Sequence, residues 1–432
     1  MSKAKKVLII ANDVVGGRMG GPGLRCWSFA EVLSRHFEVT LMGPNNFDDE
    51  YFKNIRFKYC KKGDCKISDL IRANDCLISD NYIRYLPYLS GEKLVILDLY
   101  DPILIADLEK NKNLPMERQI KRNKELTEHV LLNLLNSDYY ICSNERQKSL
   151  YLGMLLALNM IGPELLKKDA ELKNVIEIVP FGIKQVPPEH DKKVLKGVIP
   201  GIDEKDKILW WGGFVNNWFD PISLFKAMEL VSRSRQDIKL IMPPLQYPNP
   251  KVKVQEKARE AYAYAQQKSL LNKSVFYLKE WIPNRELGNY LCEADIGIST
   301  HYESLETYYS FRTRILDYIW AKLPIITSKG DYFADLVERF DLGYTVNYGD
   351  AEDIKEKILS VVSDEKKLEH FRGNLEKVQK MFYWENQLKD LVAYIRDNDA
   401  GSKRKPNVLK RSAQFLKYGI RTIMRSYLTN ER

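Results

Sequence analysis

The sequence predicts an α/β protein with two doubly wound parallel sheets that face a cleft, followed by a C-terminal amphipathic helix. Short apolar, β-branched runs alternate with longer helical patterns from the first residues onward. Such continuous apolar runs are typical of parallel strands that helices cover on both faces. The alternation stops near the middle of the chain and then begins again, and 432 residues suffice for two or three domains.

The first series of elements predicts an amino-terminal domain over residues 1–186. Its main helical patterns are Gly23–His36, Met116–Asn136 and Glu145–Met160. The expected strands are short and apolar, and they are Val7–Ala11, Val39–Met42, Cys76–Ser79, Leu94–Leu97, Tyr139–Cys142 and Ile176–Pro180. Strands that alternate with helices in this way are expected to pair in parallel.

A charged stretch rich in Pro and Gly, residues 187–206, predicts a linker. A second domain is expected over residues 207–380 and a closing helix over 381–398. The elements of the second domain show the same alternation, with strands at Ile208–Trp211, Lys239–Met242, Val275–Leu278, Ile296–Ser299, Ile325–Thr327 and Tyr344–Val346 and helices at Ser223–Ser234, Val254–Lys268, Arg285–Ala294 and Phe311–Lys322. Ligands of such sheets bind at the carboxyl ends of the strands, so the cleft is the expected site.

Charge and hydropathy exclude several classes of protein. The formal charge is +9, but residues 403–432 alone carry nine basic side chains and one acidic one, so the rest of the chain is nearly neutral. A nucleic-acid-binding protein carries its basic surface on the folded domain, and no nucleic-acid partner is expected. The longest apolar stretch, residues 151–162, is shorter than the ~18–20 residues that span a membrane.

The six cysteines are scattered, without a Cys-x-x-Cys pair or a Cys/His cluster. Neither a zinc site nor a disulfide framework is expected, and a reducing cytoplasm is the expected location. The first thirteen residues contain too few apolar side chains for a secretory signal.

A glycine-rich segment, Gly16–Gly23, follows the first expected strand. Glycines allow backbone N–H groups to approach a ligand, and the start of a helix favours a phosphate, so Gly17, Gly20 and Gly21 are candidate phosphate or acceptor contacts. The spacing is not G-x-G-x-x-G, and no acidic residue ends the second strand, which counts against NAD. A turn without ligand contacts is the alternative.

The segment from Thr300 to Pro324 is the most specific part of the sequence. It contains Ser310-Phe311-Arg312-Thr313-Arg314-Ile315-Leu316-Asp317-Tyr318-Ile319-Trp320-Ala321-Lys322-Leu323-Pro324. This segment resembles the signature of retaining GT-B nucleotide-sugar glycosyltransferases of the family-4 kind, in a bacterial branch with S-F-R-T-R-x-L-D-Y-x-W-A-x-L-P. The resemblance extends over residues 5–395 through shorter motifs, namely Asn144-Glu145-Arg146-Gln147, Val179-Pro180-Phe181-Gly182, Trp211-Gly212-Gly213, Trp218-Phe219-Asp220-Pro221 and Gly330-Asp331.

The resemblance implies retaining, metal-independent hexosyl or deoxyhexosyl transfer from a nucleoside-diphosphate sugar, without a cofactor. The donor is implied to bind the second domain and the acceptor the first. Asp317 then matches the acid that holds the donor ribose, and Glu306 is the candidate for the acid near the sugar, at a longer spacing than in the family. Further candidate donor contacts are Ser310, Gly213, Asn216 and His301, although a lone histidine is more often structural.

The family commonly places Arg and Lys after the first strand of the second domain, and residues 212–218 contain neither. Arg312 and Arg314 are the candidates that replace them at the diphosphate. Because residues two apart on a helix point to different faces, only one is expected to reach the phosphates, and Arg312 is favoured. Arg314 is also placed to form an intrahelical ion pair with Asp317.

Two carboxylates follow the fourth expected strand of the first domain. Asp98 is expected to point into the cleft and to orient or polarise an acceptor hydroxyl. Asp101 is instead expected to cap a helix that begins at Pro102. No side chain resembles an activated nucleophile, which suits a same-face transfer in which the leaving phosphate accepts the acceptor's proton. No Asp-x-Asp stands at a strand end, so no metal is expected.

Residues 403–432 predict a basic amphipathic helix that binds a membrane surface. Its apolar residues recur at spacings of three and four, and they are Leu409, Ala413, Leu416, Ile420, Ile423, Met424 and Tyr427. Packing on the protein itself or on a dimer partner is the alternative, and the oligomeric state stays open. A peripheral protein at the inner membrane face suits a lipid-linked glycan acceptor of bacterial surface glycan assembly. The competing hypotheses are a GT-B sugar-nucleotide epimerase and a non-catalytic membrane protein that binds nucleotide sugars.

Overall fold

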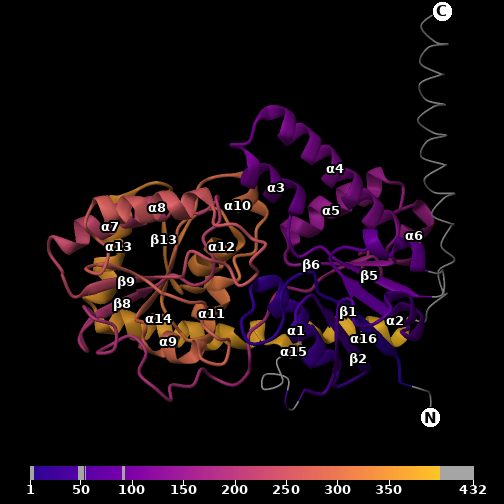
Figure 1. The fold of residues 1–432 in the computed structure, drawn as a ribbon, viewed down its shortest axis with the longest axis horizontal. Coiled ribbons are helices and arrows are strands. Elements are labelled where there is room, and N and C mark those ends of the chain that lie inside the picture. Colours follow the sequence, from indigo (N-terminus) through magenta and orange to yellow (C-terminus); the bar gives the residue numbers. More distant parts are fainter. Residues whose placement is uncertain (1–3, 47–52, 54, 90–92, 399–432) are drawn as a thin grey trace, which may run out of the picture.

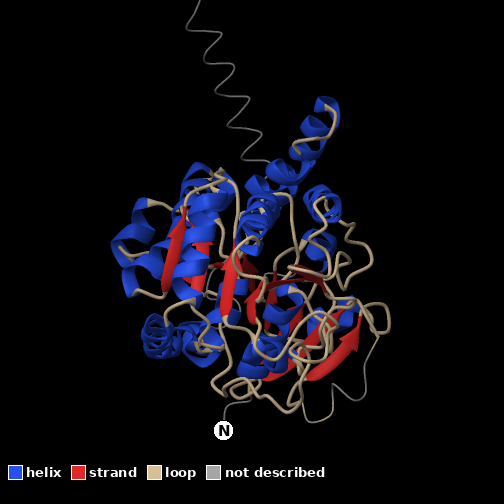
Figure 2. Ribbon diagram, turned by 90° about the vertical axis from the view of Figure 1, so that its left-hand side faces the viewer, coloured by secondary structure: helices blue, strands red, loops and turns tan. Residues whose placement is uncertain are grey.

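The computed structural model of the chain describes residues 4–46, 53, 55–89 and 93–398. The basic amphipathic helix expected over residues 403–432 therefore lies outside the described residues. Within them the chain forms two α/β domains side by side (Figure 1), and each sheet lies between layers of helices (Figure 2). No helix in this part of the chain is long and apolar enough to cross a membrane.

The first domain contains, in its described part, a seven-stranded sheet of strand order β3-β2-β1-β4-β5-β6-β7. Each pairing is parallel, with Val7 of β1 opposite both Val39 of β2 and Cys76 of β4. The strands are β1 (Lys6–Ile10), β2 (Glu38–Gly43), β3 (Lys58–Lys61), β4 (Cys76–Ser79), β5 (Leu94–Asp98), β6 (Tyr139–Cys142) and β7 (Ile176–Ile178), and the helices are α1 (Gly21–Leu33), α2 (Ile67–Ala73), α3 (Ile103–Asn111), α4 (Met116–Leu135), α5 (Glu145–Ala157) and α6 (Pro163–Lys168).

The second domain contains, in the described residues, a six-stranded parallel sheet of order β10-β9-β8-β11-β12-β13. Its strands are β8 (Lys207–Trp210), β9 (Ile238–Met242), β10 (Val275–Tyr277), β11 (Ile296–Ser299), β12 (Ile325–Ser328) and β13 (Gly343–Val346). Its helices are α7 (Pro221–Ser232), α8 (Glu256–Gln267), α9 (Leu287–Glu293), α10 (Leu305–Tyr309), α11 (Arg314–Trp320), α12 (Tyr332–Phe340), α13 (Ala351–Val362) and α14 (Glu365–Val378).

Alternation along the central strand explains why both faces of the first sheet are covered. Val7 and Ile9 belong to the apolar cluster beneath α1, whereas Leu8 and Ile10 belong to the cluster beneath α4 and α5. All four side chains are fully buried, so β1 carries a continuous apolar run. In both domains the strand order reverses beside the first strand, which places a crevice at the carboxyl ends of the strands.

The expected closing helix forms two short helices, α15 (Trp384–Gln387) and α16 (Lys389–Asp397), which lie against the first domain (Figure 1). Tyr394 of α16 stacks on Tyr139 of β6, with ring centroids 3.5 Å apart. The ammonium group of Lys5 donates to the carbonyl oxygen of Ile395 at 2.8 Å. The end of the described chain therefore returns to the domain in which the chain begins.

The expected linker, residues 187–206, contains turns and bends but no helix or strand. The linker is nevertheless fixed to the second domain, because three successive backbone N–H groups donate to the carboxylate of Glu293 on α9. These are the N–H groups of Val194, Leu195 and Lys196, at 2.7, 2.9 and 2.7 Å.

Three features differ from the sequence expectations. Strand β3 was not predicted, because it is a short edge strand in which only one residue, Cys60, is buried. The expected helix over Phe311–Lys322 begins later, at Arg314, and a separate helix, α10, precedes it. A single disulfide, which was not predicted, joins Cys60 and Cys65 and closes a short loop beside β3.

Candidate active-site cleft

The two domains enclose a cleft with a volume of about 440 Å³ at the carboxyl ends of their sheets. The first domain contributes the start of α1 and the loops after β5 and β7, and the second contributes the loops after β8, β9 and β10 together with the segment from α10 to α11. Glycines and residues with polar or charged side chains line part of this cleft, and they include Asp13, Gly20, Gly21, Asp101, Lys110, Gly212, Gly213, Asn216, Asn284, Glu306, Ser310, Arg312, Thr313, Arg314 and Asp317.

The amino end of α1 faces the cleft through Gly20 and Gly21. Gly20 is the N-cap and offers no side-chain acceptor, so the first N–H groups of the helix are available to a ligand. A side chain does not fit there, because a Cβ on Gly20 would lie 1.5 Å from the hydroxyl oxygen of Tyr247. Gly17 does not line the cleft, and its carbonyl oxygen accepts a hydrogen bond from the Asn284 N–H at 2.9 Å.

Glu306 and Arg312 form a buried, bidentate ion pair in the wall of the cleft. The two terminal nitrogens of Arg312 donate to the two carboxylate oxygens of Glu306 at 2.9 and 2.6 Å. Burial raises the pKa of Glu306, and the guanidinium opposes that effect. The sequence favours Arg312 as the diphosphate ligand, whereas the structure engages both terminal nitrogens within the protein. The short non-helical stretch after α10 turns Arg312 back towards Glu306.

Arg314 has a terminal nitrogen without a partner among the described residues, whereas both terminal nitrogens of Arg312 are paired and its Nε lacks a hydrogen-bond partner there. One terminal nitrogen donates to the Phe214 carbonyl at 2.6 Å, while the other is buried without a partner among the described residues. The guanidinium carbon lies 3.8 Å from the centre of the Phe219 ring, and burial lowers the arginine pKa to about 9. The alternative of an intrahelical ion pair with Asp317 is not observed between these two described residues.

Asp317 lies one turn further along α11 and also lines the cleft. Burial raises the pKa of its carboxyl to about 7, although Arg314 and Lys184 oppose the shift. Ser310, Gly213 and Asn216 line the same part of the cleft, and the Ser310 hydroxyl donates to the Thr307 carbonyl at 3.0 Å. The structure thus brings these predicted donor contacts together.

His301 does not line the cleft. Its side chain is fully buried, and Nε2 lies 3.1 Å from the Lys329 carbonyl oxygen, which it can reach as a donor. Burial and the nearby Arg312 lower the pKa of the imidazole well below its usual value, so the ring is neutral at physiological pH. This buried position fits a structural role for His301 and not the predicted contact with the donor.

Asp98, at the end of β5, and Asp101, in the loop after it, occupy the opposite positions to those expected. Asp98 is buried beneath α1, where the Arg25 guanidinium donates to its oxygens at 2.6 and 2.9 Å. Asp101 lines the cleft, and it does not cap α3, whose N-cap is Pro102 without a side-chain hydrogen bond. Burial, and then the negative charge of Glu306, raise the pKa of Asp101 to about 7.

Sequence reasoning missed Arg25 and the cleft position of Asp101. The signal for Arg25 was a single cation within the apolar stretch of residues 23–30, since a buried cation requires a buried counter-charge. Aromatic side chains also line the cleft, and the indole N–H groups of Trp210, Trp211 and Trp218 are buried without partners in the described part of the chain. Trp281 instead donates to the Met19 carbonyl at 3.3 Å.

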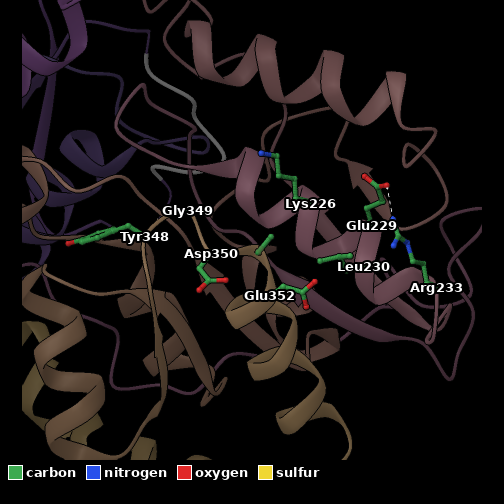
Figure 3. Close-up of a pocket in the computed structure, with 9 residues that line it drawn as sticks. Lys226, Glu229, Leu230, Arg233, Tyr348, Gly349, Asp350 and Glu352 are labelled. Atoms are coloured by element: carbon green, nitrogen blue, oxygen red, sulfur yellow. Dashed lines mark hydrogen bonds and ion pairs between the residues drawn. The ribbon is translucent and has the colours of Figure 1, made fainter.

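Another hollow, of about 530 Å³, opens on the second domain between α7 and the start of α13 (Figure 3). Its charged side chains include Lys226, Glu229, Arg233 and Asp350. Glu229 and Arg233 pair with each other at 3.3 Å, and Asp350 caps α13. This hollow contains none of the predicted site residues, so the interdomain cleft is the candidate active site.

Residues 198–378 match the family model of glycosyl transferases group 1. The matched range covers most of the second domain, including Glu306, Arg314 and Asp317, so this domain is similar to group 1 glycosyl transferases. No match was found among curated protein sequences.

Solved structures with similar folds cover nearly the whole chain. Sucrose-phosphate synthase from Thermosynechococcus elongatus is 14% identical, with a TM-score of 0.63 over 91% of this chain and 98% of that one. WaaG, a glycosyltransferase involved in lipopolysaccharide biosynthesis, is 13% identical, with a TM-score of 0.60 over 91% of this chain and 100% of that one. HepE from Anabaena, solved with UDP and glucose, is 10% identical, with a TM-score of 0.61 and coverage of 91% and 100%. The predicted GT-B fold is confirmed.

The buried pair of Arg25 and Asp98 yields a stability prediction. Asp98→Ala is expected to lower the free energy of unfolding by about 3–5 kcal/mol, because it leaves the Arg25 guanidinium buried without a counter-charge. The double variant Arg25→Met/Asp98→Leu removes both charges and is expected to be much less destabilised. Urea denaturation followed by tryptophan fluorescence measures both variants. A single variant as stable as the wild type would contradict the structural role of the pair.

Proposed function

We propose that the protein is a retaining, metal-independent glycosyltransferase that moves a hexosyl or deoxyhexosyl group from a nucleoside-diphosphate sugar to a glycan acceptor. The observation that carries this proposal is the convergence of three groups in one cleft. They are the uncapped amino end of α1, the Arg314 nitrogen that has no partner among the described residues, and the Asp317 carboxylate. The first two suit a diphosphate, and the third suits a pair of ribose hydroxyls. The similarity of the second domain to group 1 glycosyl transferases and the GT-B fold support the same class of reaction.

The proposed transfer occurs between the two domains. The bond from the anomeric carbon to the diphosphate oxygen breaks, and a bond to the acceptor oxygen forms on the same face of the sugar. The acceptor proton passes to an oxygen of the leaving diphosphate, so the products are a glycoside and a nucleoside diphosphate. Arg314 and the α1 amino end stabilise the charge that develops on the diphosphate, while Asp101 accepts a hydrogen bond from the acceptor hydroxyl and orients it.

Glu306 supports this arrangement from the second domain. Its carboxylate lines the cleft but is held by Arg312, so it is a fixed acceptor for a sugar hydroxyl and does not act as a nucleophile. The neighbouring HepE structure holds UDP and glucose, which supports a nucleotide-sugar donor without identifying the base or sugar used by this protein.

We place the protein at the inner face of the cell membrane, in the cytoplasm, acting on a lipid-linked acceptor of bacterial surface glycan assembly. This part of the proposal rests on the amphipathic pattern and the nine basic side chains of residues 403–432. Each basic side chain near an anionic leaflet contributes about 1 kcal/mol to binding, in addition to the burial of the apolar stripe.

Arg314→Met is expected to weaken nucleoside-diphosphate binding about 10- to 100-fold, because a charge-assisted hydrogen bond to phosphate is lost. Thermal shift across UDP, GDP, ADP and their sugar conjugates measures the affinities, and Arg233→Met in the hollow of Figure 3 is the matched control. No shift of the wild type with any of these ligands would refute the donor site. Nucleotide release that does not require an acceptor would instead support a sugar-nucleotide epimerase.

The turnover rate at saturating donor is expected to rise as the pH increases through about 7 and then to level off. Asp101 has its pKa raised to about 7, and only the ionised carboxylate can accept the acceptor's hydrogen bond with full strength. Asp101→Asn is expected to lower the rate and to abolish the rise. Because Asp317 has a similar pKa, Asp317→Asn is measured in parallel and is expected to weaken donor binding instead. A rate that falls across this range would contradict the role of Asp101.

A chain that ends at Ser402 is expected to lose binding to liposomes that contain anionic lipid, because it lacks the basic amphipathic segment. Sedimentation with anionic and with neutral vesicles measures this, and added salt is expected to weaken the binding of the full chain. Unchanged sedimentation of the shortened chain would refute the membrane role of the tail and would favour packing within the protein or against a dimer partner.

A further inference from the structure

The motif Asn144-Glu145-Arg146-Gln147 stands where the first domain meets the segment that carries Glu306. It forms the first turn of α5, directly after β6, and Asn144 is its N-cap. The Asn144 side-chain oxygen accepts a hydrogen bond from the Gln147 N–H at 2.8 Å. The Asn144 amide nitrogen then donates across the domain boundary to the Ser310 carbonyl at 3.2 Å.

The side chain of Gln147 is fully buried, and both its oxygen and its nitrogen form hydrogen bonds. Its oxygen accepts from the Ser143 N–H at 2.8 Å. Its nitrogen donates to the Tyr100 carbonyl at 3.1 Å and to the Tyr309 carbonyl at 3.0 Å. One amide group therefore connects the loop after β5, in the first domain, with the end of α10, in the second.

These two carbonyl groups lie close in the chain to two carboxylates that line the cleft, Asp101 and Glu306. Tyr100 directly precedes Asp101, and Tyr309 ends the helix that carries Glu306. The hydroxyl of Ser143 also donates to the Tyr100 carbonyl, at 3.1 Å, which strengthens the hold on this loop. One amide group therefore binds both of the backbone segments that carry these carboxylates.

Arg146 bridges the same boundary in a different way. Its guanidinium donates to the Tyr308 carbonyl at 2.9 Å and to the Gly330 carbonyl at 2.7 Å, and it pairs with Asp335. None of these contacts reaches the loop that carries Asp101. Arg146 therefore forms an interdomain contact that does not involve the loop of Asp101. Gln147, by contrast, binds both that loop and the end of α10.

We propose that Gln147 is a positioning residue of the transfer reaction, which holds Asp101 of the first domain at a fixed distance from Glu306 of the second. This inference rests on the proposed function, because it assigns Asp101 to the acceptor hydroxyl. Gln147 does not touch the cleft itself. It acts through the backbone on both sides of the cleft, so its loss misplaces the acceptor hydroxyl relative to the donor and leaves the donor contacts of Arg314 and Asp317 in place.

Gln147→Met keeps the volume of the side chain and removes its hydrogen bonds. At saturating donor its turnover rate is expected to fall by up to about 100-fold, as for a reacting group misplaced by about 1 Å. Its affinity for nucleoside diphosphate in the thermal-shift assay is expected to stay within about 2-fold of the wild type, because no donor contact changes. The midpoint of the pH profile is expected to move below that of the wild type, because Glu306 raises the pKa of Asp101 more than its ion-pair partner Arg312 lowers it, and both move away together. Lys110 lowers and Asp80 raises the same pKa, but both belong to the first domain and stay in place.

The matched control is Arg146→Met, which removes an interdomain contact to the same segment but none to Tyr100. It is expected to keep the wild-type pH midpoint. Ser143→Ala removes only the hydroxyl contact to the Tyr100 carbonyl, and it is expected to shift the rate and the midpoint in the same direction by less. This second variant decides the question if Gln147→Met does not fold.

The outcomes distinguish this inference from the function on which it rests. A wild type that neither binds nucleoside diphosphates nor transfers sugar overturns the proposed function. An active wild type whose rate and pH midpoint are unchanged by Gln147→Met overturns the positioning role. A lower melting temperature with an unchanged pH midpoint shows that Gln147 serves stability alone, and it also overturns the inference.

Discussion

The arrangement of the cleft depends on the buried ion pair between Glu306 and Arg312. A bidentate pair with both partners shielded from water is directional, and removing either partner leaves an uncompensated charge. The pair fixes a carboxylate in the wall of the cleft and withdraws one of the two arginines of the segment from ligand binding. Arg314 packs over Phe219 with one nitrogen unpaired in the described structure, and it is therefore the cation that we propose for the diphosphate.

The groups around the cleft come from two domains, so the relative position of the domains is part of the chemistry. On one side of the cleft, two hydrogen bonds cross from the second domain to the first. The Tyr247 hydroxyl donates to the Asp13 carboxylate at 2.7 Å, and the Trp281 indole N–H donates to the Met19 carbonyl at 3.3 Å. On the other side, Asn144 and Gln147 bind backbone carbonyl groups of the second domain. Hydrogen bonds that end on the main chain constrain position more strictly than contacts between long, exposed side chains, which lose more entropy when they are held.

Most of the fold followed from local pattern, and the exceptions have physical causes. Three strands, Cys76–Ser79, Tyr139–Cys142 and Ile296–Ser299, have the ends that their apolar runs predict, because each run is buried on both faces. The expectation that Asp98 points into the cleft was wrong for a related reason. Alternation puts it on the same face of β5 as Ile96, beneath α1, whereas Asp101 lies beyond the strand, where the loop opens into the cleft.

The sequence by itself determined the fold class, the two domains and the segment that supplies Glu306, Ser310, Arg314 and Asp317, because hydrophobic periodicity and a contiguous motif are properties of neighbouring residues. Only the tertiary structure decided how the charges pair. Arg25 and Asp98 are 73 residues apart in the chain, and Asp101 and Glu306 belong to different domains. Ion pairing and pKa shifts depend on separations of a few ångströms and on burial, and the folded chain alone sets these.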